Sequence, residues 1–279
     1  MTISIMKMLI GLSSSAIVCL AAWRCRALTV SGAAAAFVVG ALIMGLGGLA
    51  FAVPLIVFFV TSSAWSRWRT GNQRAAEKHG RNASQVIGNG GVAALIAVAA
   101  ALTPAHMLPT TRDWFLLYVA SLAFANADTW ATEIGSKLSR SARRISDWAR
   151  VTSGTSGAVS LPGSLAALAG SLVVAASAAA VWPTAAFALQ WPMDWAEALA
   201  VTWAGFVGSL VDSLLGATVQ AEYRCAKCGK HTEAVTHCDM PTLKLRGLRW
   251  FGNGAVNFAG SLAAVLAAWY LLQSFAWPI

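Results

Sequence analysis

The sequence predicts an all-α, polytopic membrane protein with about eight transmembrane helices in one integral membrane domain, residues 1–279. Three observations support this fold class. The chain is 57% hydrophobic and only 11% charged, whereas a soluble domain carries about 25% charged residues. Its apolar runs have about the 20 residues that a helix needs to cross a bilayer. The basic residues are concentrated in alternate connections between these runs.

The expected helices, in order, cover residues 4–23, 28–47, 48–65, 86–104, 113–131, 159–182, 197–218 and 254–276. The first run continues directly into Trp23-Arg24, so we expect a retained helix and not a cleaved signal peptide. Gly47 and Gly48 divide one long apolar run into two helices, because glycine permits a tight turn there.

The distribution of charge predicts the orientation in the membrane. All lysines and arginines except Lys7 and Arg112 fall after the first, third, fifth or seventh helix, on one side of an eight-helix arrangement. The positive-inside rule therefore places both termini outside and the long basic connections in the cytoplasm. The net charge of +9 indicates topology and a bilayer partner, with no nucleic acid. In a bacterium this would be the inner or plasma membrane.

Three carboxylates lie where apolar helices approach the basic connections: Asp128, Glu133 and Asp212. Ionisable groups at membrane depth are costly and therefore functional candidates, and carboxylates at a basic cleft suit Mg²⁺. Asn126 and Thr129 could add neutral oxygens. On a helix, Asp128 and Glu133 point about 140° apart, so a shared site needs a broken helix end or a ligand between them. Alternatively, these carboxylates pair with arginine or lysine and fix the topology.

A loop of glycine, serine and threonine opens the sixth helix and includes Thr152, Gly154, Thr155, Ser156 and Gly157. Such a loop offers backbone N–H groups and hydroxyls to a phosphate, aided by the helix dipole. No lysine of a Walker motif follows it. Small residues of this kind also pack membrane helices together, so a turn with ordinary packing is the alternative.

Two pairs of polar residues have helical spacing. Gln85 and Asn89 lie four residues apart at the start of the fourth helix, and Asn253 and Asn257 repeat this spacing at the start of the eighth. Residues four apart share a helix face. Each pair could bind a ligand or make buried contacts between helices, and the spacing does not distinguish these alternatives.

The cytoplasmic segment 220–250 contains Cys225, Cys228, His237 and Cys238. Three sulfurs and one imidazole with a Cys-x-x-Cys spacing are the ligand types of a structural zinc site. His231 is an alternative fourth ligand. A reduced or redox-active loop is the other interpretation, since cysteines clustered in one loop suit a reducing compartment better than a disulfide framework.

The motifs around Asp128, Gly154, Asp212, Cys225 and Asn253, in this order, resemble an integral membrane family long of unknown function that includes the plant phytyl-phosphate kinase. The resemblance runs from about residue 31 to 269. It implies phosphoryl transfer from a nucleoside triphosphate to an isoprenyl monophosphate, with Mg²⁺ as cofactor. The segment from Asp128 to Gly135 is also similar to membrane polyprenol kinases and cytidylyltransferases that use CTP, which favours CTP as donor.

On this reading Asp128, Glu133 and Asp212 are catalytic, and Asp128 and Asp212 hold the magnesium. The residues expected to bind the nucleotide and the lipid phosphate are Arg81, Gln85, Asn89, Asn126, Thr129, Lys137, Arg140, Arg143, Arg144, Thr152, Gly154, Thr155, Ser156, Gly157, Ser209, Gln220, Asn253 and Asn257.

The rival interpretation is a transporter or flippase for a phosphorylated or isoprenoid lipid. Transporters bind their cargo near the bilayer midplane, whereas these carboxylates are expected at the inner boundary. A membrane scaffold that binds partners through its cysteine segment is a third interpretation, but it leaves the intramembrane carboxylates unexplained. The oligomeric state stays open, a homo-oligomer included.

Overall fold

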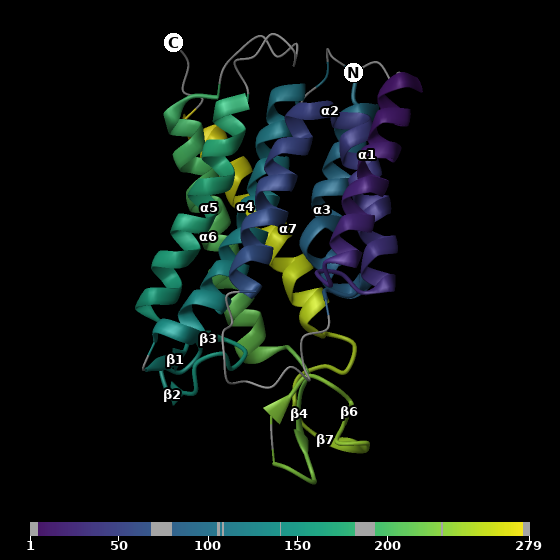
Figure 1. Cartoon of the computed structure of the whole chain (residues 1–279). Coiled ribbons are helices and arrows are strands. Elements are labelled where there is room, and N and C mark those ends of the chain that lie inside the picture. The colour runs from purple at the N-terminus through teal and green to yellow at the C-terminus, as the bar shows by residue number, and fades with distance from the viewer. Residues whose placement is uncertain are drawn as a thin grey trace.

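The computed structural model describes residues 5–67, 80–104, 107, 109–139, 141–181, 193–229 and 231–275, apart from the side chains of His231 and Phe275. The long helices lie side by side in a bundle (Figure 1). They are α1 (Ile5–Arg24), α2 (Val30–Arg67), α3 (Ala83–Leu102), α4 (Thr111–Leu138), α5 (Leu161–Val181), α6 (Trp195–Thr218) and α7 (Asn253–Phe275). All of these except α4 are long and apolar enough to cross a membrane.

Helix α2 is folded into a hairpin. Its 38 residues would extend about 57 Å if straight, nearly twice the hydrocarbon thickness of about 30 Å. Gly48 interrupts it with φ 68° and ψ −157°, a backbone conformation that suits glycine. Arg67 at its end donates a 2.9 Å hydrogen bond to the carbonyl of Cys25, just before its start. Both ends of α2 therefore lie together, and the expected division at Gly47-Gly48 gives eight helical segments.

Helix α4 forms the centre of the bundle. It packs against α2, α3, α5, α6 and α7, and its residues 115–127 are buried. The hydroxyl of Tyr118 donates a 2.5 Å hydrogen bond to the carbonyl of Phe51 in the second half of α2. By contrast, α1 exposes large apolar side chains such as Ile5 and Ile17. Because other helices surround α4, it does not need the continuous apolar surface that the outer helices present to lipid.

The start of α1 and the end of α7 lie at the same end of the bundle, and two small sheets lie at the opposite end (Figure 1). We call that opposite end the basic end, since it carries the cationic connections. The first sheet has the order β2-β1-β3, formed by β1 (Ala142–Arg144), β2 (Arg150–Val151) and β3 (Ala158–Val159). The second has the order β5-β4-β7-β6, formed by β4 (Glu222–Cys225), β5 (His231–Thr232), β6 (Thr236–His237) and β7 (Met240–Arg246).

The all-α prediction is thus confirmed for the membrane domain but incomplete at the basic end. The strands there are short, and the longest of them, β7, is exposed along most of its length. Such strands lack the alternation of apolar and polar residues by which a half-buried strand is recognised.

Candidate functional site

A cleft of about 160 Å³ opens at the basic end, between α4, α5, α6 and the loop that precedes α5. We call it the carboxylate cleft, because Asp128 of α4 and Asp212 of α6 both line it. The structure brings nine of the predicted residues into it: Asp128, Asp212, Gly154, Thr155, Ser156, Gly157, Ser209, Gln220 and Asn253.

The carboxylates of Asp128 and Asp212 lie close enough to interact electrostatically. The amide side chains of Asn257 and Asn89 support Asp212. With its amide nitrogen turned towards α6, Asn257 donates to Oδ2 of Asp212 over 3.1 Å. The amides of Asn257 and Asn89 are in turn 2.9 Å apart. These contacts join α3, α7 and α6. Asn89 and Asn257 are buried and hold Asp212 in position. Neither is among the described residues that line the cleft.

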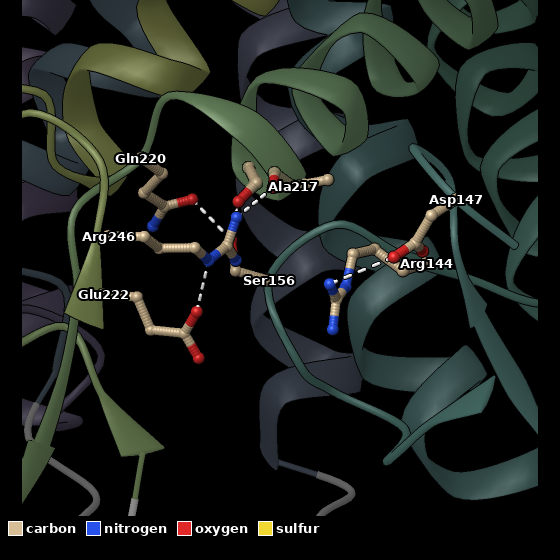
Figure 2. A network of polar contacts seen from close by, with 8 residues as sticks. Arg144, Asp147, Ser156, Ala217, Gln220, Glu222 and Arg246 are labelled. Carbon is tan, nitrogen blue, oxygen red and sulfur yellow. Dashed lines mark hydrogen bonds and ion pairs between the residues drawn. The ribbon is translucent and has the colours of Figure 1, made fainter. Parts of the chain in front are cut away.

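The glycine-rich loop is fastened to the end of α6. Ser156 donates a 2.5 Å hydrogen bond to Oε1 of Gln220 (Figure 2) and a 3.2 Å bond to the carbonyl of Gly216. Gly157 has φ 77°, and a Cβ built there would lie 2.5 Å from Cβ of Ala217. Within the described chain, the N–H groups of Gly154, Ser156 and Gly157 donate to no protein acceptor. The loop therefore presents backbone donors beside the carboxylates.

A larger hollow of about 1150 Å³ adjoins the cleft and is lined by cations, including Arg144, Arg150 and Arg246, and by Thr152. Figure 2 shows Arg246 between Glu222 and the end of α6, where it pairs with Glu222 and donates to the carbonyl of Ala217. Arg144 forms an ion pair of 3.3 Å with Asp147. Arg144, one of the predicted cations, thus lines the hollow that adjoins the cleft.

The structure adds a carboxylate that sequence reasoning missed, Glu233. It lies in the connection between β5 and β6 and lines both the cleft and the adjoining hollow. Its charge acts on both Asp128 and Asp212. Glu233 as a whole is exposed, but desolvation of its carboxyl beside the cleft, and then the nearby charge of Glu222, raise its pKa above the ordinary value. Three carboxylates from distant parts of the chain therefore converge on one small volume.

Glu133, expected in the same site as Asp128, does not line the carboxylate cleft. Helix α4 continues without a break to Leu138, so the two carboxylates project from different faces, as their spacing requires. Glu133 instead acts electrostatically on the guanidinium of Arg81, which lies 5.8 Å from the ring centroid of Phe58.

Arg81, Gln85 and Asn89 line a separate, mostly apolar hollow of about 550 Å³ between α1, α2 and α3. Gln85 also completes a capping box with Asn82 at the start of α3. These three side chains therefore line this hollow and not the carboxylate cleft.

Two predicted polar residues make contacts within or between helices. Asn126 is fully buried in α4. It accepts a 3.0 Å hydrogen bond from Thr61 and donates one of 2.8 Å to the carbonyl of Gly170. The hydroxyl of Thr129 donates to the carbonyl of Ala125, one turn earlier in the same helix. Neither residue lines the carboxylate cleft.

Two further predicted cations, Lys137 and Arg143, also lie outside the cleft. Lys137 donates to the carbonyl of Trp65 over 3.3 Å, near the end of α2. Arg143 donates to the carbonyl of Trp148 over 2.8 Å and is exposed. Arg140 lies outside the described residues.

The four candidate zinc ligands lie together in the second sheet. One ligand atom from each of Cys225, Cys228, His237 and Cys238 falls within 4.8 Å of all the others. Nδ1 of His237 is 3.5 Å from Sγ of Cys228 and 3.2 Å from Sγ of Cys238. A hydrogen bond from the backbone of Cys228 is the main cause that lowers the pKa of Cys225 to about 6.

Comparison with known proteins places the chain in a family. The family described as integral membrane protein DUF92 matches residues 13–265. The chain is 29% identical to Protein PGR of Arabidopsis thaliana over 92% of its own length and 93% of that protein. It is 31% identical to an uncharacterized membrane protein of Synechocystis over 71% of its length and 74% of that protein. It is 26% identical to an uncharacterized membrane protein of Methanocaldococcus jannaschii over 70% of its length and 75% of that protein.

No solved structure matches the chain. The expectation of an integral membrane family with plant members is confirmed: the chain belongs to the integral membrane family DUF92.

Proposed function

We propose that this protein is a membrane-embedded phosphotransferase. It transfers the terminal phosphoryl group of a nucleoside triphosphate to an isoprenyl monophosphate, such as phytyl phosphate, and forms the diphosphate. The observation that carries the proposal is the shared cleft. Asp128 and Asp212 line it together with a glycine-rich loop that offers unpaired N–H groups.

The donor set of the cleft fits magnesium. Mg²⁺ prefers oxygen ligands, and commonly takes one or two carboxylates together with water and substrate phosphates. Asp128 and Asp212 supply the carboxylates, and Ser209 and Ser213 lie at the same wall. When bound, the ion would neutralise charge on the triphosphate. Asn257 holds Asp212 in orientation through the hydrogen bond to Oδ2.

The loop and the cations suit the phosphates. Backbone N–H groups of Gly154, Ser156 and Gly157 are directed donors for phosphate oxygens. Arg144, Arg150 and Arg246 of the adjoining hollow attract the polyanionic nucleotide from the aqueous side.

Three apolar side chains also line the cleft: Ala167 of α5, and Phe206 and Leu210 of α6. An isoprenyl chain could lie between these helices in the bilayer while its phosphate rests beside the carboxylates. This arrangement serves an acceptor with an apolar tail and an anionic head.

The reaction needs no protein nucleophile. An oxygen of the acceptor monophosphate forms a bond to the terminal phosphorus as the bond to the bridging oxygen breaks, and the nucleoside diphosphate leaves. Such transfers depend mainly on positioning and charge stabilisation. The acceptor oxygen is already ionised, so it needs no general base. CTP is our favoured donor, from the resemblance of the segment starting at Asp128 to CTP-dependent membrane enzymes.

The test is a transfer assay on purified protein in detergent with Mg²⁺. Each of γ-labelled CTP, ATP, GTP and UTP is combined with phytyl, geranylgeranyl or undecaprenyl monophosphate. We expect label in a prenyl diphosphate, with CTP as the best donor. Free prenols are tested as acceptors in parallel. If label appears only in the phosphates of these prenols, the protein is an alcohol kinase. No transfer with any pair, from folded protein, would favour the lipid transporter instead.

A further inference from the structure

The second sheet has a small core: among its described strand residues, only Tyr223 and Cys225 of β4 are buried. In the longest strand, β7, Leu243 is 62% exposed and Leu245 is 47% exposed, and Val235 in the preceding connection is 63% exposed. The partner strands β5 and β6 have two residues each. Small sheets with so little buried apolar surface generally require a disulfide or a metal ion. The cysteines in this segment are free thiols.

The four clustered side chains supply what the apolar core lacks. Cys225 ends β4 and is only 1% exposed, and Cys228 follows in the turn after it. His237 ends β6, and Cys238 begins the turn into β7. Gly229, Cys238 and Asp239 have φ of 71°, 54° and 60°. These left-handed residues bend both turns so that the ligand atoms meet within 4.8 Å, although such a conformation is costly for cysteine.

We propose that Cys225, Cys228, His237 and Cys238 bind one Zn²⁺, and that this ion holds the connection carrying Glu233 over the carboxylate cleft. Three sulfurs and one imidazole complete a closed tetrahedral set, which is typical of a structural site. The four ligands leave no open coordination position, so the ion would stabilise the local fold and would not bind a substrate.

The position of Glu233 explains the second half of the proposal. Glu233 lies between the two halves of the ligand set, after Cys228 and before His237. Two residue pairs join β5 to β4 and two join β6 to β7 among the described residues, and Thr242 donates to the carbonyls of Ala234 and Val235 within the connection. An ion bound on both sides of this connection adds a restraint at its two ends, where the strands are shortest. The zinc site does not depend on the proposed phosphoryl transfer, and its test needs no activity.

The experiment uses the full-length protein in detergent. Elemental analysis of the purified chain should give about one zinc per chain. Cobalt added to chelator-treated protein should give the visible bands of tetrahedral cobalt bound to thiolates. Cys228→Ser should lose both signals. Cys25→Ser is the matched control, because Cys25 is also an exposed free cysteine at the basic end, and it should keep both.

Hydrogen–deuterium exchange tests the position of Glu233. After zinc removal, amides 231–237 should exchange at least about tenfold faster, whereas those of α5 should not change. If neither zinc nor cobalt binds the unaltered protein stoichiometrically, the metal site is wrong. If zinc binds but its removal leaves exchange at 231–237 unchanged, the ion does not hold Glu233 in place.

Discussion

Ser156 and Gln220 are joined by a 2.5 Å hydrogen bond from the serine hydroxyl to the amide oxygen, and this bond fastens the glycine-rich loop to the end of the helix that carries Asp212. Gly157, the next residue, packs against Ala217 of the same helix. The loop is therefore docked against the helix that carries Asp212. The proposed donors for phosphate and the proposed cation ligand are held close together by these contacts.

Replacing Gly157 tests that relationship. In Gly157→Ala, the positive φ and the close approach to Ala217 should destabilise the protein by roughly 1–3 kcal/mol and raise the KM for the nucleotide. The matched control is Gly252→Ala, since a Cβ at Gly252 meets nothing within 4 Å. Thermal unfolding in detergent and nucleotide titrations measure both effects. Equal behaviour of the two variants would contradict the tight docking of the loop.

Glu233 gives a pH dependence of defined sign. Its pKa is raised above the ordinary value of 4.5 in the folded protein, so the folded state binds the proton more tightly than the unfolded state. Without divalent cations, the free energy of unfolding should therefore fall as pH rises from about 4.5 through the raised pKa. Glu233→Gln should make this dependence weaker, and the other carboxylates of the cleft should account for what remains. Thermal unfolding against pH for both proteins checks the sign, and identical curves would count against it.

Glu133 should matter for stability and not for turnover. Its charge acts on Arg81, so Glu133→Gln leaves that partly buried guanidinium less compensated. We expect a loss of roughly 1–3 kcal/mol, below the effect of breaking a fully buried pair. The proposed transfer rate at saturating substrate should stay near that of the unaltered protein. If Glu133→Gln were stable but had a turnover as low as that of Asp128→Asn, Glu133 would take part in the proposed reaction.

The hairpin in α2 predicts which residues face each side of the membrane. Leu49, next to the turn, is 63% exposed and lies at the end where α1 begins, whereas Cys25 lies at the basic end. An impermeant thiol reagent should label Leu49→Cys and Cys25 from opposite sides of sealed vesicles. The Leu49→Cys variant for this test carries Cys25→Ser. Labelling of both positions from one side would mean that α2 does not fold back at Gly48.

Several features of the fold follow from sequence for clear physical reasons. Gly47-Gly48 lies near the middle of a run too long for one crossing, so the hairpin follows from length and backbone freedom. Asp128 and Asp212 lie near the basic ends of their helices, so the expected topology places them at similar depth. The helix period also shows that Asp128 and Glu133 diverge, and α4 continues unbroken between them.

Other features depend on tertiary contacts that no local pattern carries. Glu233 lies in a polar connection with no motif of its own, and only the pairing of β4, β5 and β7 returns it to the cleft. The amide of Asn126 is of a type that binds ligands, but here it is hydrogen-bonded to Thr61 and to the carbonyl of Gly170 from other helices. Its role could not be read without knowing which helices surround α4.

The most direct test of the central claim is the rate of phosphoryl transfer by Asp128→Asn. The control is Asp147→Asn, which removes an exposed carboxylate at the same end of the protein. Because Asp147 pairs with Arg144, both variants are compared at saturating nucleotide. Both variants should fold, because each substitution preserves size. We expect Asp128→Asn to lower turnover about 100-fold or more and Asp147→Asn to keep normal turnover. Equal turnover in the two variants would show that Asp128 does not take part in the chemistry.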